Sequence, residues 1–192
     1  EGFTWEQEYQ RGVPMGRLTR AGKAGKKTGT KITFKPDATI MNVVEFNYDT
    51  LSQRLRELAF LNKGLTITLT DERADPPKSH EFHYSGGIAE FIRHLNRGKS
   101  VLHEKPIHFE GERELPQGTL VMEVALQYND SYSENIFSFA NNINTVDGGS
   151  HLSGFRSALT RTINAAGQTG GLFKDVKENL SGDGVREGLT AA

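Results

Sequence analysis

The sequence predicts an α+β protein, and its composition and its pattern of periodicities are the basis. Hydrophobic residues make up 35% of the 192 positions, and 11 Phe supply material for a core. Segments with strand-like alternation and segments with helical periodicity come in separate groups, which favours α+β over a regularly alternating α/β fold. No run approaches the ~20 apolar residues that a membrane span needs. The length fits one large domain, or one domain with a piece of another.

The first part of the chain reads as a short strand followed by a basic loop. Alternation over residues 5–9 predicts the strand. Residues 11–36 contain glycines that break periodicity and no acidic residue, and their eight basic residues are Arg11, Arg17, Arg20, Lys23, Lys26, Lys27, Lys31 and Lys35. We expect this basic loop to end in a strand over residues 30–35, with Ile32 and Phe34 on one face.

Two helices and a hairpin follow. A helix begins at residues 47–49 and ends before Gly64, because leucines recur at helical spacing at positions 51, 55, 58 and 61. Residues 65–70 and 80–84 predict two strands of a hairpin around a Pro-Pro turn. A second helix follows Gly86-Gly87, with an apolar stripe of Ile88, Phe91, Ile92 and Leu95.

The last part predicts a βαβ unit. Strand candidates cover residues 106–109, 120–128 and 135–140, and a helix covers residues 150–166 with Asp147 as its N-cap. Its predicted buried residues are Leu152, Phe155, Leu159 and Ile163. After a helical turn within 183–189, a further strand begins near Thr190. We expect that strand to return to the sheet that holds residues 135–140.

Several kinds of chemistry lack support. There is no cysteine, so disulfides and thiolate metal sites are excluded, which is consistent with a reducing compartment. His80 and His83 are three apart on a predicted strand and therefore point to opposite faces, so we expect no metal site. Neither a phosphate-binding loop nor a nucleophile elbow occurs, and we assign no catalytic residue. With a net charge of −1, attraction to nucleic acid requires local basic patches.

Thr28-Gly29-Thr30 lies where the basic loop meets the predicted strand. One interpretation is a turn that needs a glycine. The other is that small Gly29 admits a ligand close to the backbone while a threonine hydroxyl hydrogen-bonds it. The basic loop itself is either a solvated loop or a contact for phosphate or DNA.

Ordered blocks along the whole chain resemble the ATPase components of bacterial type II topoisomerases, namely DNA gyrase B and its relative in topoisomerase IV. The blocks are Arg11-Gly12-Val13-Pro14, Thr28-Gly29-Thr30, Phe34-Lys35-Pro36-Asp37, residues 55–62, Tyr84-Ser85-Gly86-Gly87-Ile88, Glu134-Asn135-Ile136, Asn141-Asn142-Ile143, residues 147–152, Gly154-Phe155-Arg156 and Arg186-Glu187-Gly188-Leu189. The segment from Asn141 to Phe155 is the most specific. Within it, the block from Asn141 to Leu152 argues against other ATPases of the same group, such as MutL or Hsp90.

The resemblance implies two domains. Residues 1–45 would be the C-terminal part of a GHKL-type ATPase domain. Residues 46–192 would be a transducer domain like domain 2 of ribosomal protein S5, truncated at its C-terminus. A non-enzymatic nucleic-acid-binding module of the S5 fold is the alternative from another class, but such a module has no reason to carry Thr28-Gly29-Thr30.

The resemblance also implies the site residues and the cofactors. ATP and Mg²⁺ belong to the parent protein, with the magnesium ligands outside this chain. Thr28, Gly29 and Thr30 would form one wall of the nucleotide pocket, where aminocoumarin inhibitors compete. Arg156 resembles a basic residue lining a cavity for DNA; an ordinary salt bridge is the equal alternative. Asp147 reads as a cap rather than a functional acid.

The implied function is to relay ATP binding and hydrolysis to a DNA gate during strand passage. The implied partners are DNA, the gyrase A protein in an A2B2 heterotetramer, and a second copy of gyrase B when ATP binds. We expect a cytoplasmic location and no membrane contact. We also expect the chain to be inactive alone.

Overall fold

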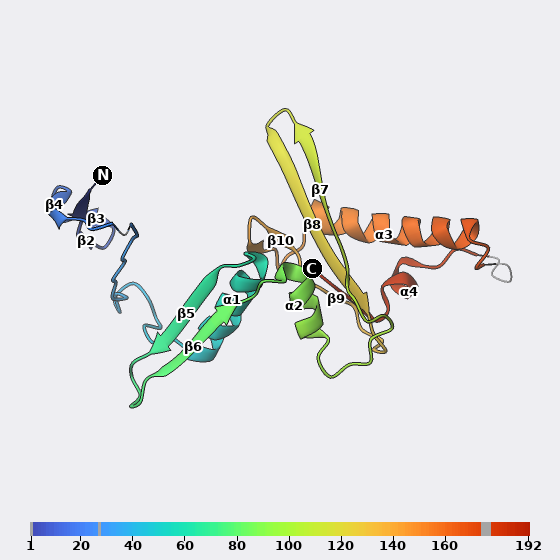
Figure 1. The fold of residues 1–192 in the computed structure, drawn as a ribbon, viewed down its shortest axis with the longest axis horizontal. Coiled ribbons are helices and arrows are strands. Elements are labelled where there is room, and N and C mark those ends of the chain that lie inside the picture. Colours follow the sequence, from blue (N-terminus) through green and yellow to red (C-terminus); the bar gives the residue numbers. More distant parts are fainter. Residues whose placement is uncertain (1, 27, 174–177) are drawn as a thin grey trace. The chain divides into compact units, whose positions relative to one another are not determined.

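The computed structural model describes residues 2–26, 28–173 and 178–192, which belong to two compact units, Glu1–Asn47 and Tyr48–Ala192 (Figure 1). Helices and strands occur together along the chain, so the predicted α+β class is confirmed. Within the described residues, no helix has the length and apolar character needed to cross a bilayer.

The first unit contains two short antiparallel strand pairs. β1 (Phe3–Glu6) pairs with β4 (Thr19–Lys23), and β2 (Tyr9–Gln10) pairs with β3 (Val13–Pro14). The strand expected over residues 5–9 is therefore divided between β1 and β2. Within the basic loop, residues 13–14 and 19–23 belong to these pairs.

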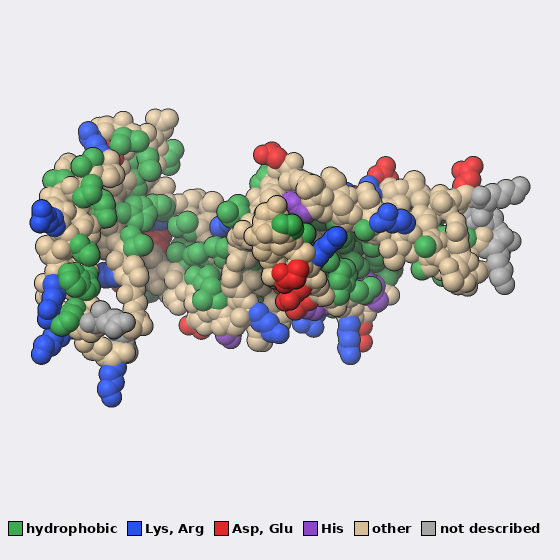
Figure 2. Space-filling model, turned by 90° about the horizontal axis from the view of Figure 1, so that it is seen from above, with side chains coloured by type: hydrophobic (Ala, Val, Ile, Leu, Met, Phe, Trp, Pro, Cys, Tyr) green, Lys and Arg blue, Asp and Glu red, His purple; other side chains and the backbone are tan. Residues whose placement is uncertain are grey.

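The strand expected over residues 30–35 is wrong, because this segment is neither helix nor strand. A strand exists through hydrogen bonds to a neighbour, and the ladders of the described part of the chain do not include these residues. Ile32 and Phe34 are consequently 80% and 70% exposed. Hydrophobic and basic side chains share the surface of this unit, which lies at the left of Figure 2.

The second unit begins with a helix packed on a hairpin. α1 (Tyr48–Leu61) has the predicted leucine stripe, and the chain turns at Gly64, whose φ is +80°. β5 (Thr66–Asp71) and β6 (Lys78–His83) pair over their whole length, and α1 packs on both. The helix and the hairpin confirm the prediction.

α2 (Gly87–Leu95) also forms as predicted. Gly87 at its start has a φ of +60°, a conformation that favours glycine. Ile88, Phe91 and Ile92 of the apolar stripe are buried. This stripe places α2 against the main sheet.

The main sheet has the strand order β7-β8-β12-β9. Its long hairpin is formed by β7 (Ile107–Leu115) and β8 (Gly118–Tyr128), and β12 (Leu189–Ala191) lies between β8 and β9 (Asn135–Ile136). β12 runs antiparallel to β8 and parallel to β9. The predicted return of the last strand into the sheet of residue 135 is therefore confirmed.

Two further strands and two helices connect β9 to β12. β10 (Phe139–Ala140) and β11 (Ile143–Asn144) form a small hairpin, so the strand expected over 135–140 is two strands in different sheets. α3 (Ser150–Thr169) is the long orange helix of Figure 1, and α4 (Gly182–Arg186) is a short turn before β12.

The core lies on both faces of β8. Val124 and Leu126 pack with Phe155 and Leu159 of α3 on one face. Ala125 packs against α2 on the other face. Of the four residues predicted to be buried in α3, all are only partly buried. The reason is that α3 packs on the sheet along one side only, and the other sides of the helix are open to solvent.

A polar cluster is buried where α2, β8 and β12 meet. Asn96, just after α2, donates from Nδ2 to Gln127 Oε1 over 2.9 Å and accepts at Oδ1 from Thr190 Oγ1 over 2.8 Å. Asn129 Nδ2 donates to both Asn96 Oδ1 and Thr190 Oγ1 over 3.1 Å. Because each buried polar group finds a partner, the cluster avoids the cost of unpaired groups and fixes how these elements meet.

Candidate functional site

Thr28, Gly29 and Thr30 are exposed in a segment without regular secondary structure. Gly29 does not have positive φ, and an added Cβ there would meet nothing within 4 Å. Neither the backbone nor the described neighbours therefore require glycine at this position, so the turn interpretation lacks support. The ligand interpretation stays a prediction.

Two of the sequence blocks meet in the first unit. Arg11 and Gly12 have φ values of +51° and +83° and form the two-residue turn between β2 and β3. Arg11 then reaches Asp37, with 2.6 Å between Nε and Oδ2, and donates to Thr39 Oγ1 over 3.1 Å. The block at residues 11–14 is thus joined to the block at residues 34–37, a contact that sequence spacing did not reveal.

The environment of Asp37 favours its ionised form. Thr39 donates to Oδ1 from its hydroxyl over 2.7 Å and from its backbone N–H over 2.8 Å. These bonds, followed by that of Arg11, lower the pKa of Asp37. The Asp37 carboxylate therefore holds Arg11 and Thr39 together, and each bond that it accepts stabilises its ionised form.

The block that begins at Asn141 contacts α1 and the residue that follows this helix. Asn141 and Asn142, with φ values of +50° and +66°, make the turn between β10 and β11, a conformation that asparagine tolerates. Asn142 Nδ2 donates to Asn62 Oδ1 over 3.0 Å, and its carbonyl oxygen accepts from Arg54 over 3.3 Å. Asn142 therefore connects the β10–β11 hairpin to Arg54 of α1 and to Asn62, the residue that follows this helix.

The expectation that Asp147 caps α3 is wrong. The N-cap position is Gly149, and no side chain bonds the first turn there. Gly148 and Gly149 separate Asp147 from Ser150, the first helical residue. An N-cap carboxylate must be one residue before the helix to reach the N–H groups of its first turn.

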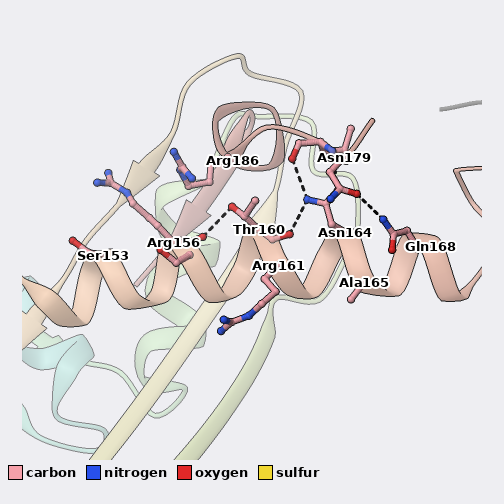
Figure 3. A pocket seen from close by; sticks show the side chains of 12 residues that line it. Ser153, Arg156, Thr160, Arg161, Asn164, Ala165, Gln168, Asn179 and Arg186 are labelled. Atoms are coloured by element: carbon pink, nitrogen blue, oxygen red, sulfur yellow. Dashed lines mark hydrogen bonds between the residues drawn. The ribbon is translucent and has the colours of Figure 1, made fainter. Parts of the chain in front are cut away.

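An open groove of about 820 Å³ runs along α3, bounded by the segment that leads to α4 (Figure 3). Its charged lining residues are Arg156, Arg161 and Arg186, and the described residues that line it include no acidic one. Asn164, Gln168 and Asn179 add amide groups. Arg161 leaves α3 on a different side from Arg156 (Figure 3), as the spacing of five predicts. Cations together with neutral hydrogen-bonding groups are the chemistry that binds phosphate.

Arg156 shares one carboxylate with Arg186. Glu134, directly before β9, accepts at Oε1 from Nε of Arg156 and at Oε2 from Nε of Arg186, both over 2.8 Å. Arg186 also donates to Asp183 over 2.8 Å. The salt bridge offered as the alternative for Arg156 is therefore present, while its contact with DNA stays a prediction. Glu134 and Arg186 belong to recognised blocks, but their sequence separation hid their pairing.

Opposing influences act on the pKa of Glu134. Partial burial is the largest and raises it, but the hydrogen bonds from Arg186 and Arg156 and their charges together outweigh burial and lower the pKa. The carboxylate is therefore ionised at neutral pH.

The histidines fit structural or exposed positions. His80 and His83 face opposite sides of β6, as expected, and His83 hydrogen-bonds Thr66. Strand pairing also brings together His108, Glu110 and Glu123, with 2.9 Å between His108 Nε2 and Glu123 Oε1. Spacing along the sequence does not reveal this cluster, because Glu123 reaches it only through the β7–β8 register. All three side chains are exposed, and strand pairing together with the hydrogen bond between His108 and Glu123 accounts for their proximity.

The fold places this chain in a class of proteins. Its structure matches the 43K ATPase domain of Thermus thermophilus gyrase B, solved in complex with an aminocoumarin, with a TM-score of 0.80 and 35% sequence identity. The match covers all of this chain and 51% of that one. The chain therefore has the architecture found in the ATPase domain of a type II topoisomerase.

The chain belongs to the DNA gyrase B family, whose model matches residues 87–192. It is 56% identical to DNA gyrase B of Halalkalibacterium halodurans over 192 residues, and 53% identical to that of Myxococcus xanthus over 190 residues. These alignments cover 100% and 99% of this chain, but only 29% and 22% of the two relatives.

Proposed function

We propose that this chain is part of the ATPase component of a type II DNA topoisomerase and relays nucleotide binding and hydrolysis to a DNA gate. Its membership of the gyrase B family carries the proposal. Residues 1–45 would belong to the nucleotide-binding domain and residues 46–192 to the transducer. DNA, the gyrase A protein and a second copy of gyrase B would be the partners, with ATP and Mg²⁺ as cofactors.

A supercoiling assay tests this proposal. The full-length protein containing this segment is combined with the gyrase A protein and relaxed circular DNA. We expect negative supercoils that require ATP. Decatenation without supercoiling would assign the protein to topoisomerase IV instead. No ATP-dependent change of topology, with either the gyrase A protein or its topoisomerase IV counterpart, would contradict the proposal.

Nucleotide recognition by Thr30 gives a second expectation. In the full-length protein, Thr30→Val keeps the shape but removes a hydroxyl that would bond the adenine side of ATP. Loss of one such bond costs on the order of 1 kcal/mol, so we expect ATP and aminocoumarins to bind about fivefold more weakly in calorimetry. Thr33→Val, three residues away in the same exposed segment, is the matched control. Equal affinities for the Thr30 variant and the wild type would show that Thr30 does not contact the nucleotide.

The isolated 192-residue chain is expected not to turn over ATP. It contains no phosphate-binding loop and no assigned general base. A coupled assay should therefore stay below ~0.1 s⁻¹, a rate already below the roughly 1 to 10³ s⁻¹ of ordinary enzymes. Turnover above that rate, lost on removal of Mg²⁺, would show a catalytic site that our interpretation of these residues lacks.

A further inference from the structure

Next to the groove along α3 lies a carboxylate, that of Glu134, which binds residues of the groove without lining it. Glu134 does not line the groove, yet its carboxylate binds two of the three arginines that do. Its side chain is 24% exposed, compared with 42% for Arg156 and 14% for Arg186. The more exposed arginine is thus held by a carboxylate that is partly shielded from solvent.

The two arginines are held unequally. Arg156 directs both Nε and Nη2 to the same oxygen of Glu134, and no other carboxylate in the described residues pairs with it. Arg186 divides its bonds between Glu134 and Asp183. Arg186 therefore fixes Glu134 in place from the α4 side, while Glu134 is the sole counter-charge at Arg156 among the residues that the structure describes.

A carboxylate and a phosphate compete for the same donors. A guanidinium offers planar N–H pairs that fit either anion, and Arg156 faces a groove whose described lining has only cations and neutral groups. The negative charge of Glu134 at hydrogen-bond distance lowers the potential that Arg156 can present to a second anion.

We propose that Glu134 is an internal anion that occupies the donors of Arg156 and must yield them when a phosphate of the DNA backbone enters the groove. Arg186 is a positioning residue that retains Glu134 afterwards. This inference rests on the proposed function, because it takes DNA as the anion that the groove meets.

A double-mutant cycle on the 192-residue chain tests the competition. The wild type, Glu134→Gln, Arg156→Gln and the double variant are titrated with a fluorescent 20-base-pair duplex at about 50 to 200 mM salt. Glutamine keeps an acceptor oxygen for the arginines but removes the charge. We expect Glu134→Gln to bind at least about fivefold more tightly at the lowest salt, with a log–log salt slope steeper by up to ~0.9, as for one added phosphate contact. In the Arg156→Gln background this gain should disappear.

Asp183→Asn is the matched control. It also removes one negative charge, from a fully exposed carboxylate that contacts Arg186 but not Arg156. We expect less than about a twofold effect on DNA affinity, because a screened surface charge acts weakly at a distance. Inorganic phosphate, titrated at the same ionic strength, separates the sources of the anion. If free phosphate binds in a way that depends on Arg156 while binding of the duplex does not depend on Arg156, the assignment to the DNA backbone is overturned.

The outcomes separate the inference from the proposed function. If Arg156→Gln weakens DNA binding but Glu134→Gln does not strengthen it, the inference fails while the DNA contact stands. If Glu134→Gln strengthens binding equally without Arg156, the competition is not at Arg156 and the inference also fails. If neither the wild type nor Glu134→Gln binds the duplex, both the inference and the assignment of this groove to DNA are overturned.

A measurement on the wild type covers the case in which Glu134→Gln does not fold. The Nε–H resonance of Arg156, assigned by its absence in Arg156→Lys, should shift on addition of the duplex. The Nε–H of Arg186 should remain near its original position, because that arginine keeps Glu134. An Arg156 resonance that stays unchanged at saturating DNA would overturn the proposal.

Discussion

Replacing Gly188 with alanine should destabilise the second unit by on the order of 4 kcal/mol, from left-handed backbone strain and overpacking together. Gly188 has a φ of +72°, and a Cβ there would collide with the carbonyl oxygen of Asn129 and lie 2.9 Å from that of Ser131. These are backbone atoms, so no side-chain rotation relieves the contact. The carbonyl oxygen of Gly188 also accepts from the N–H of Asn129 over 2.9 Å. A backbone shift that relieved the collision would therefore break this hydrogen bond, which lies directly before β12.

Gly98→Ala is the matched control for this prediction. Gly98 has a φ of +80°, but an added Cβ meets nothing within 4 Å. The Gly98→Ala variant should therefore lose only the part of the unfolding free energy that comes from backbone strain, about 1 kcal/mol. Urea unfolding followed by circular dichroism measures both. Equal losses for the two variants would show that the approach of Gly188 to residues 129 and 131 is not tight.

Phe60→Ala should cost the same unit about 3 to 5 kcal/mol, as expected for truncation of a buried aromatic ring. Phe60 is only 1% exposed and lies at the contact between α1 and α2. Its ring stacks on Tyr84 with 3.6 Å between centroids and packs near Phe91 at 5.1 Å. Removing it leaves a cavity that the surrounding rings cannot fill without moving the helices.

Tyr132→Ala is the control for loss of an aromatic ring without a cavity. Tyr132 is 89% exposed, and its truncation should change the unfolding free energy by less than about 0.5 kcal/mol. The comparison uses urea midpoints at unchanged m-values. A loss for Phe60→Ala no larger than that for Tyr132→Ala would mean that the α1–α2 contact does not support the unit.

Local periodicity was sufficient for α1, α2, α3 and the β5–β6 hairpin of the second unit, but it missed the β10–β11 hairpin, whose first strand lies in the stretch expected as a single strand over 135–140. The leucine spacing of α1 and the glycine pair before α2 determine where these helices form, because both act over a single turn. The return of β12 beside β9 was also predictable, since a strand, a long helix and a further strand favour a parallel return. These features depend on neighbours in sequence or on a general rule of connection.

The segment proposed as the nucleotide wall has a structure that periodicity does not determine. Alternation at Ile32 and Phe34 satisfies the pattern of a strand, yet a strand requires a partner, and the described chain provides none. Residue type offered Thr28, Gly29 and Thr30 as a ligand contact or a turn, and only the resemblance assigned them to a nucleotide pocket. The role in nucleotide binding that we propose for them would rest on contacts that alternation cannot specify.

What the sequence alone determined is therefore the α+β class, the helices, the β5–β6 hairpin, the return of β12 beside β9 and the family. Only the tertiary structure decided that Glu134 holds Arg156 and Arg186, and that Arg11 pairs with Asp37. It also excluded Asp147 as a cap, because two glycines move it away from the helix. The physical reason is range: propensity and periodicity act within a few residues, whereas an ion pair depends on distances set by the packing of elements that are far apart in the chain.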